Sequence, residues 1–252
     1  MVRESRLNGF VFLLFLLLAW EWLAQAEFIN PLIVPAASRI LSTFFAQLSS
    51  GDMPSQIAAS LRRAAVGYVL AAVVFVPLGI LMGLFEPLHR ALEVIIEMVR
   101  PIPPPAVIPV AMLIFGLEDE MKVFVIFFSC AWPILLNTLD GVKNIDRILL
   151  FTARTFHLSQ TKIIFKVILP ACSPQIVTGL RVSLPITLIL VVISEMVGST
   201  DGIGYFILDS QRRFRIAQMY AGMLSLAILG YALNQLFDLL QGWLLPWHKR
   251  GR

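Results

Sequence analysis

The sequence predicts an all-α polytopic membrane protein with about six transmembrane helices, and three observations support this fold class. Of the 252 residues, 58% are hydrophobic and only 14% are charged, and the mean hydropathy is +0.82, values typical of membrane proteins. The apolar residues gather into segments long enough to cross a bilayer. The basic residues lie mostly in the loops between these segments, as the positive-inside rule describes.

The same properties exclude several classes of protein. The net charge of +4 is explained by the basic loops, so we expect no nucleic-acid partner. Cys130 and Cys172 lie far apart, one in an apolar segment and one in a basic loop, which argues against a disulfide framework. The sequence contains no GxxxxGK[ST] motif for a nucleotide. His89, His157 and His248 lie in three separate segments, so we expect neither a metal site nor catalytic residues.

Residues 1–27 predict an N-terminal helix that runs outward from a basic end. Arg3 and Arg6 precede an apolar run, and Ala24-Gln25-Ala26 resembles a signal-peptide cleavage site. The bulky Trp20-Glu21-Trp22 argues against cleavage, because that part of a signal peptide is normally small and neutral. A retained helix is therefore favoured over a cleaved signal peptide.

Residues 28–56 predict an outer segment with an interfacial helix at 35–48. One face of this helix is apolar, which suits a helix that lies on the membrane surface. The residues of that face are Ile40, Leu41, Phe44, Phe45 and Leu48.

Residues 57–252 predict the core bundle, and we expect residues 1–252 to form a single domain. The expected spans are 57–85, a broken span at about 88–116, 121–139, 175–197 and 216–243. Small residues should let neighbouring helices approach the first of these spans closely. They are Ala64, Gly67, Ala71, Gly79 and Gly83. Arg62 and Arg63 fall on its outer end, where snorkelling to lipid headgroups is favoured over a basic entrance for anions.

The third span contains a proline-rich break at residues 100–105. Successive prolines cannot sit inside an intact helix, because each lacks an N–H and clashes with the preceding turn. Non-helical backbone at membrane depth is tolerated against protein or a watery cavity, so the break either lines the pathway or is a kink that serves packing. The candidate pathway residues are Pro103, Pro104, Ala106, Thr187, Ser194 and Glu195.

Two alternatives remain for the fifth span, 175–197. Thr187 and Ser194 share a face, but hydroxyls in membrane helices more often bond a backbone carbonyl than a substrate. Arg181 and Glu195 are 14 residues apart, about 21 Å of helix, so we expect each of them to reach its own interface. The segment 198–215, rich in glycine and polar residues, is expected to be an outside loop.

The loop at 141–173 carries a short amphipathic helix between two spans. An apolar stripe runs along this helix, flanked by Arg147 and Arg154. The residues of the stripe are Ile148, Phe151, Thr152, Phe156 and Leu158. Ser159 is placed to cap a second helix, which Pro170 and Pro174 should end. A helix that protrudes in this way offers a surface that another protein can grip.

This loop resembles the EAA loop of permease subunits of bacterial ABC importers. That pattern reads EAA, three residues, Gly, nine residues, Ile, one residue, Leu-Pro. It places residues 151–153 at EAA, His157 at the Gly, Val167 at the Ile and Leu169-Pro170 at the Leu-Pro without a gap. The sequence departs from this pattern at three positions: it has Phe151 in place of Glu, Thr152 in place of the first Ala, and His157 in place of Gly.

Three further stretches are similar to the branch of this family that serves taurine, alkanesulfonates, nitrate and thiamine precursors. They are RPIPPPAVIPVAMLIFGL, PACSPQIVTGLRVSL and SEMVGSTDGIGYFILDSQRR. They occur in the order of the family, and the resemblance covers nearly the whole chain.

The resemblance implies the type I ABC importer permease fold with a cytoplasmic coupling helix. The residues implied for ATPase coupling are Phe151, Thr152, Ala153, Arg154, Phe156, His157, Leu169 and Pro170. The implied partners are a second permease, identical or a close paralogue, two ABC ATPase subunits that bind ATP and Mg, and a periplasmic substrate-binding protein. The implied location is the bacterial inner membrane with both termini cytoplasmic, and the implied substrate is a small anion such as a sulfonate, taurine or nitrate.

A secondary transporter or channel is the alternative, and a scaffold is a third class. Coupling to an ion gradient usually requires carboxylates buried within spans. Glu21, Glu93, Glu97 and Glu195 are the candidates, and each lies toward the end of a span. A scaffold would leave the protruding loop and the broken third span unexplained.

Overall fold

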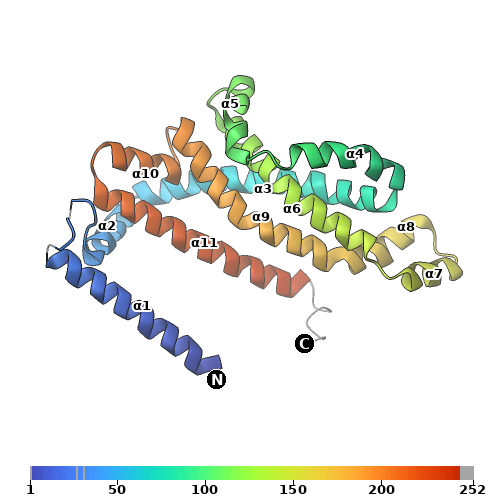
Figure 1. The fold of residues 1–252 in the computed structure, drawn as a ribbon, viewed down its shortest axis with the longest axis horizontal. Helices are drawn as coiled ribbons and strands as arrows, with labels where there is room; N and C mark the ends of the chain where they lie inside the picture. The colour runs from blue at the N-terminus through green and yellow to red at the C-terminus, as the bar shows by residue number, and fades with distance from the viewer. Residues whose placement is uncertain (1, 27, 31, 245–252) are drawn as a thin grey trace. The chain divides into compact units, whose positions relative to one another are not determined.

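The computed structural model describes residues 2–26, 28–30 and 32–244, and all regular structure in these ranges is helical (Figure 1). Two compact units share the chain: residues 1–59 with 200–228, and residues 60–199 with 229–252. The helices α3 (Asp52–Leu84) and α11 (Ile216–Leu244) contribute residues to both units.

The first unit contains α1 (Val2–Gln25), α2 (Ala37–Ser49), α10 (Ile203–Arg212) and the first parts of α3 and α11. Its core forms where Phe44, Met53 and Ala221 meet. The hydroxyl of Ser225 also lies 3.4 Å from the sulfur of Met53. Near the end of α1, Glu21 accepts hydrogen bonds from the backbone N–H and the hydroxyl of Ser38, at 3.0 and 2.7 Å.

The structure divides the apolar face predicted for residues 35–48. Ile40 and Phe44 are buried, whereas Leu41 and Phe45 are exposed. Part of the predicted membrane-facing surface therefore packs against the protein itself, because α2 folds onto the start of α3 and onto α11.

The segment expected to be an outside loop, 198–215, contains the ten-residue helix α10, which the sequence analysis did not predict, and its side of the membrane stays a prediction. The helix follows Gly202, whose φ of 104° only glycine adopts without strain. Ile203, Ile207 and Ser210 are buried along one side. Their spacing of four and three residues is helical, and this pattern could have revealed α10.

The second unit contains the helices that surround the loop at 141–173. They are α4 (Glu86–Val99), α5 (Pro104–Phe115), α6 (Asp119–Lys143), α7 (Arg147–Thr155), α8 (Gln160–Ile163), the π-helical segment η1 (Ile164–Ile168) and α9 (Leu169–Gly198). The helices α6 and α9 pair along much of their length. Their buried side chains form the core together with residues of α3 and α5.

The close approach of α3 and α6 confirms the prediction drawn from the small residues of the span expected at 57–85. A Cβ atom on Gly67 would lie 2.7 Å from Ile126, and one on Gly83 would lie 2.6 Å from Val142. Real Cβ atoms essentially never approach so closely, so the glycines allow side chains of α6 to pack directly against the backbone of α3.

Four helices of the described chain are long and apolar enough to cross a membrane: Asp52–Leu84, Asp119–Lys143, Gln160–Gly198 and Ile216–Trp243. The helices α4 and α5 make a fifth if the pair counts as one span, and they meet at an angle of 98°. The break thus lies where the prolines predict it, since α4 ends at Val99 and α5 begins at Pro104. The N-terminal span, which would bring the total to six, remains a prediction, because the apolar stretch described there, Leu14–Gln25, is shorter.

Pro170 and Pro174 do not end the second loop helix, so this expectation was wrong. The helix continues from Gln160 through both prolines to Gly198. Just before Pro170 the chain forms a π-helical turn, in which the N–H of Leu169 donates to the carbonyl of Ile164. Pro170 then lies in the first turn of α9, where its missing N–H and rigid φ are tolerated.

Candidate functional site

The helix α7 is held at both ends by its own sequence. At its start the carboxylate of Asp146 accepts a hydrogen bond of 2.8 Å from the backbone N–H of Ile148, which satisfies one free donor of the first turn. At its end the N–H of His157 donates to the carbonyl of Arg154, and the N–H of Leu158 donates to that of Ala153. These two bonds form a Schellman motif, which terminates a helix.

His157 has a φ of 52°, in the left-handed region. The EAA pattern places glycine at this position, and glycine adopts that conformation without strain. Histidine is among the residues that tolerate it better than most. The departure at His157 therefore keeps the backbone geometry for which the pattern uses glycine.

One side of α7 packs on the second unit and the other side is uncovered. Ala153 is buried in a cluster with Val142, Ile163 and Ile168. Three apolar side chains of the predicted stripe are instead exposed: Ile148 by 69%, Phe151 by 63% and Phe156 by 74%. The polar member of the stripe, Thr152, and the flanking Arg154 are exposed as well. Only Leu158, half-buried in the cluster, turns toward the protein.

The structure brings part of the Leu-Pro pair to the same place. Leu169 packs against the cluster that holds Ala153, whereas Pro170 is exposed on α9. Figure 1 shows α7 beyond the end of α6, with α8 leading back to α9. The predicted coupling residues thus form one region, with Ala153 and Leu169 on its protein side.

Glu195 and Arg63 do not reach the interfaces expected for them, and both expectations were wrong. Glu195 is 1% exposed and Arg63 is 4% exposed. They form an ion pair of 2.9 Å, and both carboxylate oxygens of Glu195 accept from Ser60 at 2.9 Å. Burial favours this arrangement because a buried charge is stable only when it is paired and hydrogen-bonded.

The same arginine connects a third helix. Its Nε donates to Asp119 at 2.6 Å, and the exposed Arg62 pairs with the other oxygen of that carboxylate. Residues of α3, α6 and α9 are therefore joined by one charge network. Arg181, at the other end of α9, pairs with Asp238 of α11.

The hydroxyls predicted as pathway candidates are buried and bond to backbone carbonyls. Thr187 donates to the carbonyl of Ser183 at 3.0 Å, and Ser194 donates to that of Val191 at 2.9 Å. Thr187 also lines an apolar cavity of about 190 Å³ with residues of α3 and α11. No residue of the proline break lines this cavity, and Pro103 and Ala106 are exposed at the bend.

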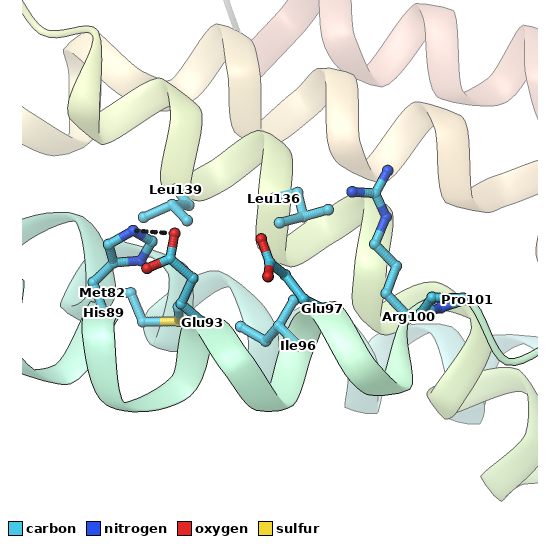
Figure 2. A pocket seen from close by; sticks show the side chains of 9 residues that line it. All are labelled: Met82, His89, Glu93, Ile96, Glu97, Arg100, Pro101, Leu136 and Leu139. Carbon is cyan, nitrogen blue, oxygen red and sulfur yellow. Dashed lines mark ion pairs between the residues drawn. The ribbon is translucent and has the colours of Figure 1, made fainter.

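A larger cavity, of about 460 Å³, lies against α4, and the sequence analysis did not identify it (Figure 2). His89, Glu93, Glu97 and Arg100 line it together with apolar residues of α3 and α6. From the sequence, the two glutamates were recognisable only as residues near the end of a span. The signal that could have found the cavity is the spacing of four, four and three residues, which places all four side chains on one helical face.

These features define the class of the protein: a multi-pass helical membrane subunit with a broken span and a short helix outside the spans. The chain belongs to the family of binding-protein-dependent transport system inner membrane components, whose model matches residues 75–250. It is accordingly a permease subunit of an ABC importer, a transport protein and not an enzyme.

Individual relatives and a solved structure agree with this assignment. The nitrate import permease protein NrtB of Leptolyngbya laminosa is 36% identical over 191 residues, which cover 76% of this chain and 68% of the relative. The taurine transport system permease protein TauC of Escherichia coli is 29% identical over 238 residues, 92% of this chain and 86% of the relative. The fold is similar to that of the MetNI methionine ABC transporter in an inward-facing conformation, with a TM-score of 0.63, 20% identity, and coverage of 77% of this chain and 96% of the other.

Proposed function

We propose that this permease works as one of a pair and that α7 is the surface that binds an ATPase subunit. The observation that carries the proposal is the apolar stripe that the second unit leaves uncovered, Ile148, Phe151 and Phe156. Exposed aromatic residues that gather on one short helix are typical anchors of a protein interface.

The way α7 is held supports a role in transmitting motion. Its first turn is capped by Asp146, its last turn is closed by the Schellman motif, and Ala153 fixes its inner side in the cluster. A helix held at three places moves as a rigid body with the residues it packs against. A displacement of the ATPase subunits would therefore reach α9 through η1 and would rock the bundle between two states.

The other parts of the transporter follow from this proposal. The two ATPase subunits would bind ATP and Mg, and a substrate-binding protein would deliver the solute on the opposite side of the bacterial inner membrane. Both termini of the permease would be cytoplasmic, and α7 would lie on the same side. The relatives named for nitrate and taurine support a small solute that carries an oxyanion group.

The pathway proposal is strongest at the proline break. Pro103 and Ala106 are exposed at a bend of 98°, where the backbone of Pro101–Pro103 is not helical. The pathway proposal is weaker for Thr187, Ser194 and Glu195, because their polar groups already form hydrogen bonds with other residues of the chain.

Reconstitution tests the proposed function. The permease, its ATPase and its binding protein in proteoliposomes should import solute only with enclosed ATP at the ATPase side, and permease alone should import none. The control omits only the binding protein and should lower uptake at limiting solute. Uptake by permease alone, driven by an ion gradient, would contradict the proposal and favour a secondary transporter.

A further inference from the structure

The cavity against α4 is lined along one side by charged and polar groups. His89, Glu93, Glu97 and Arg100 point from α4 toward α6, as Figure 2 shows. The rest of the lining is mostly apolar. It consists of Met82, Ile96, Pro101, Leu136 and Leu139.

The helix α4 carries these charges on one side and apolar residues on another. The helices α4 and α5 together are long and apolar enough for a bent span. On another side of α4, Val94, Ile95 and Met98 are exposed, as lipid-facing residues are. Charged side chains within a membrane span normally face a water-filled cavity or the bundle interior and mark the path of a solute.

At one end of the cavity the charges are already engaged. The Nζ of Lys143 lies 2.6 Å from the Nε2 of His89. The carboxylate of Glu93 lies 3.8 Å from the same nitrogen. The positive charge of Lys143 therefore lies close to the negative charge of Glu93.

At the other end of the cavity lie one carboxylate and one guanidinium group. Glu97 and Arg100 both line the cavity, and neither side chain forms an ion pair or a hydrogen bond within the described ranges of the chain. Their positions on the helix differ by about 4.5 Å along its axis, at 1.5 Å per residue. A ligand with two opposite charges a few ångströms apart would satisfy both.

We propose that this cavity binds a small zwitterion, an aminoalkyl sulfonate or carboxylate, with its ammonium on Glu97 and its acid group on Arg100. The inference rests on the proposed function and narrows the substrate class. A plain anion would meet Arg100 but would be repelled by Glu93 and Glu97, and a plain cation would be repelled by Arg100.

Binding of paired ligands to the full-length permease in lipid nanodiscs tests this. Taurine or β-alanine, measured by calorimetry, should bind at least tenfold more tightly than ethanesulfonate, propionate or ethylamine, each of which carries one of the two charges. Glu97→Gln and Arg100→Gln should each weaken binding of the zwitterion about ten- to hundredfold, the usual effect of losing a charge-assisted hydrogen bond.

Matched controls lie on the same helix. Glu86 and Arg90 pair with each other at 3.0 Å and do not line the cavity, so Glu86→Gln and Arg90→Gln should leave the affinity unchanged. The inference is overturned if neither zwitterion binds folded permease more tightly than the single-charge ligands, or if Glu97→Gln and Arg100→Gln bind as well as the unmodified chain. A complete transporter that still imports nitrate with ATP in that case would leave the proposed function standing.

Discussion

His157 connects the sequence pattern to the backbone of α7. Its left-handed conformation, with a φ of 52°, lies at the position where the EAA pattern has glycine. The carbonyls of Ala153 and Arg154 accept the two bonds that close the helix there. The turn, and not the side chain, is therefore the feature that this position requires.

Replacing His157 with glycine should stabilise the permease, because a left-handed residue with a Cβ costs about 1 kcal/mol. His157→Val should lower the stability by a similar or larger amount, since branching at Cβ makes this conformation less favourable still. Thermal unfolding in detergent measures both effects. Arg154→Gly, a glycine in the right-handed part of the same helix, is the control and should destabilise by up to about 1 kcal/mol. A melting temperature for His157→Gly below that of the unmodified protein would refute this account of the turn.

The buried pair of Arg63 and Glu195 makes a second prediction. Removing one partner with Glu195→Ala leaves Arg63 without a buried counter-ion and should lower the stability by about 3–5 kcal/mol. The double variant with Arg63→Met should recover much of this loss, because an apolar pair requires no desolvation of charge.

Unfolding measurements on the two single variants and the double variant form the required cycle. Arg62→Met is the control, because Arg62 is exposed and its ion pair should contribute at most about 1 kcal/mol. Strictly additive losses in the cycle would show that Arg63 and Glu195 act independently.

At the scale of elements, packing of α3 on α6 depends on the absence of side chains. Gly79→Ala would place a Cβ 2.8 Å from Thr138 and 2.9 Å from the carbonyl of Leu135. Since the backbone of α6 cannot yield as a flexible side chain does, we expect a loss of about 1–3 kcal/mol. Gly230→Ala in α11 is the control, because its nearest neighbour, Leu188, would be 3.4 Å away. Equal melting temperatures for the two variants would contradict this description of the contact.

Most elements were predictable because their signals are local. Long apolar runs indicated α3, α6, α9 and α11, and the prolines at 101–105 located the break between α4 and α5. The π-helical turn before Pro170 was not predictable, since proline usually ends a helix. Only the packing of η1 on α7 and α9 shows why the helix continues into α9. The helix α10 was missed because its glycines and polar residues outweighed a three-residue buried pattern.

The candidate site was predictable to a lesser degree. The stripe on α7 could be recognised from its periodicity, but the outward direction of Phe151 and the inward direction of Leu158 depend on where α7 meets the rest of the unit. Pairing of Glu195 with Arg63 joins residues 132 positions apart in the sequence. No local pattern connects such residues, so sequence reasoning assigned each to its nearest interface.

At the scale of the whole molecule, the proposed orientation places α7 and α10 on opposite sides of the membrane. Single cysteines at Ser159 and Thr200, both exposed, should therefore react with an impermeant maleimide from opposite sides in right-side-out vesicles. Ser159 should react only after the membrane is opened. Both buried native cysteines, Cys130 and Cys172, should stay unlabelled and serve as the background control. Labelling of both introduced cysteines from outside would exclude this orientation.

The central claim is that the permease is coupled to its ATPase through the uncovered stripe of α7, and Phe156 is its most exposed member at 74%. Truncating an aromatic anchor at the centre of an interface typically costs about 2 kcal/mol or more. The most direct measurement is co-purification of the ATPase subunit with Phe156→Ala, using Phe214→Ala, another exposed phenylalanine at 86%, as the matched control. We expect Phe156→Ala to remain folded and inserted in the membrane but to lose its ATPase subunit, while Phe214→Ala retains it. A Phe156→Ala permease that keeps both its ATPase subunit and full uptake would contradict the claim.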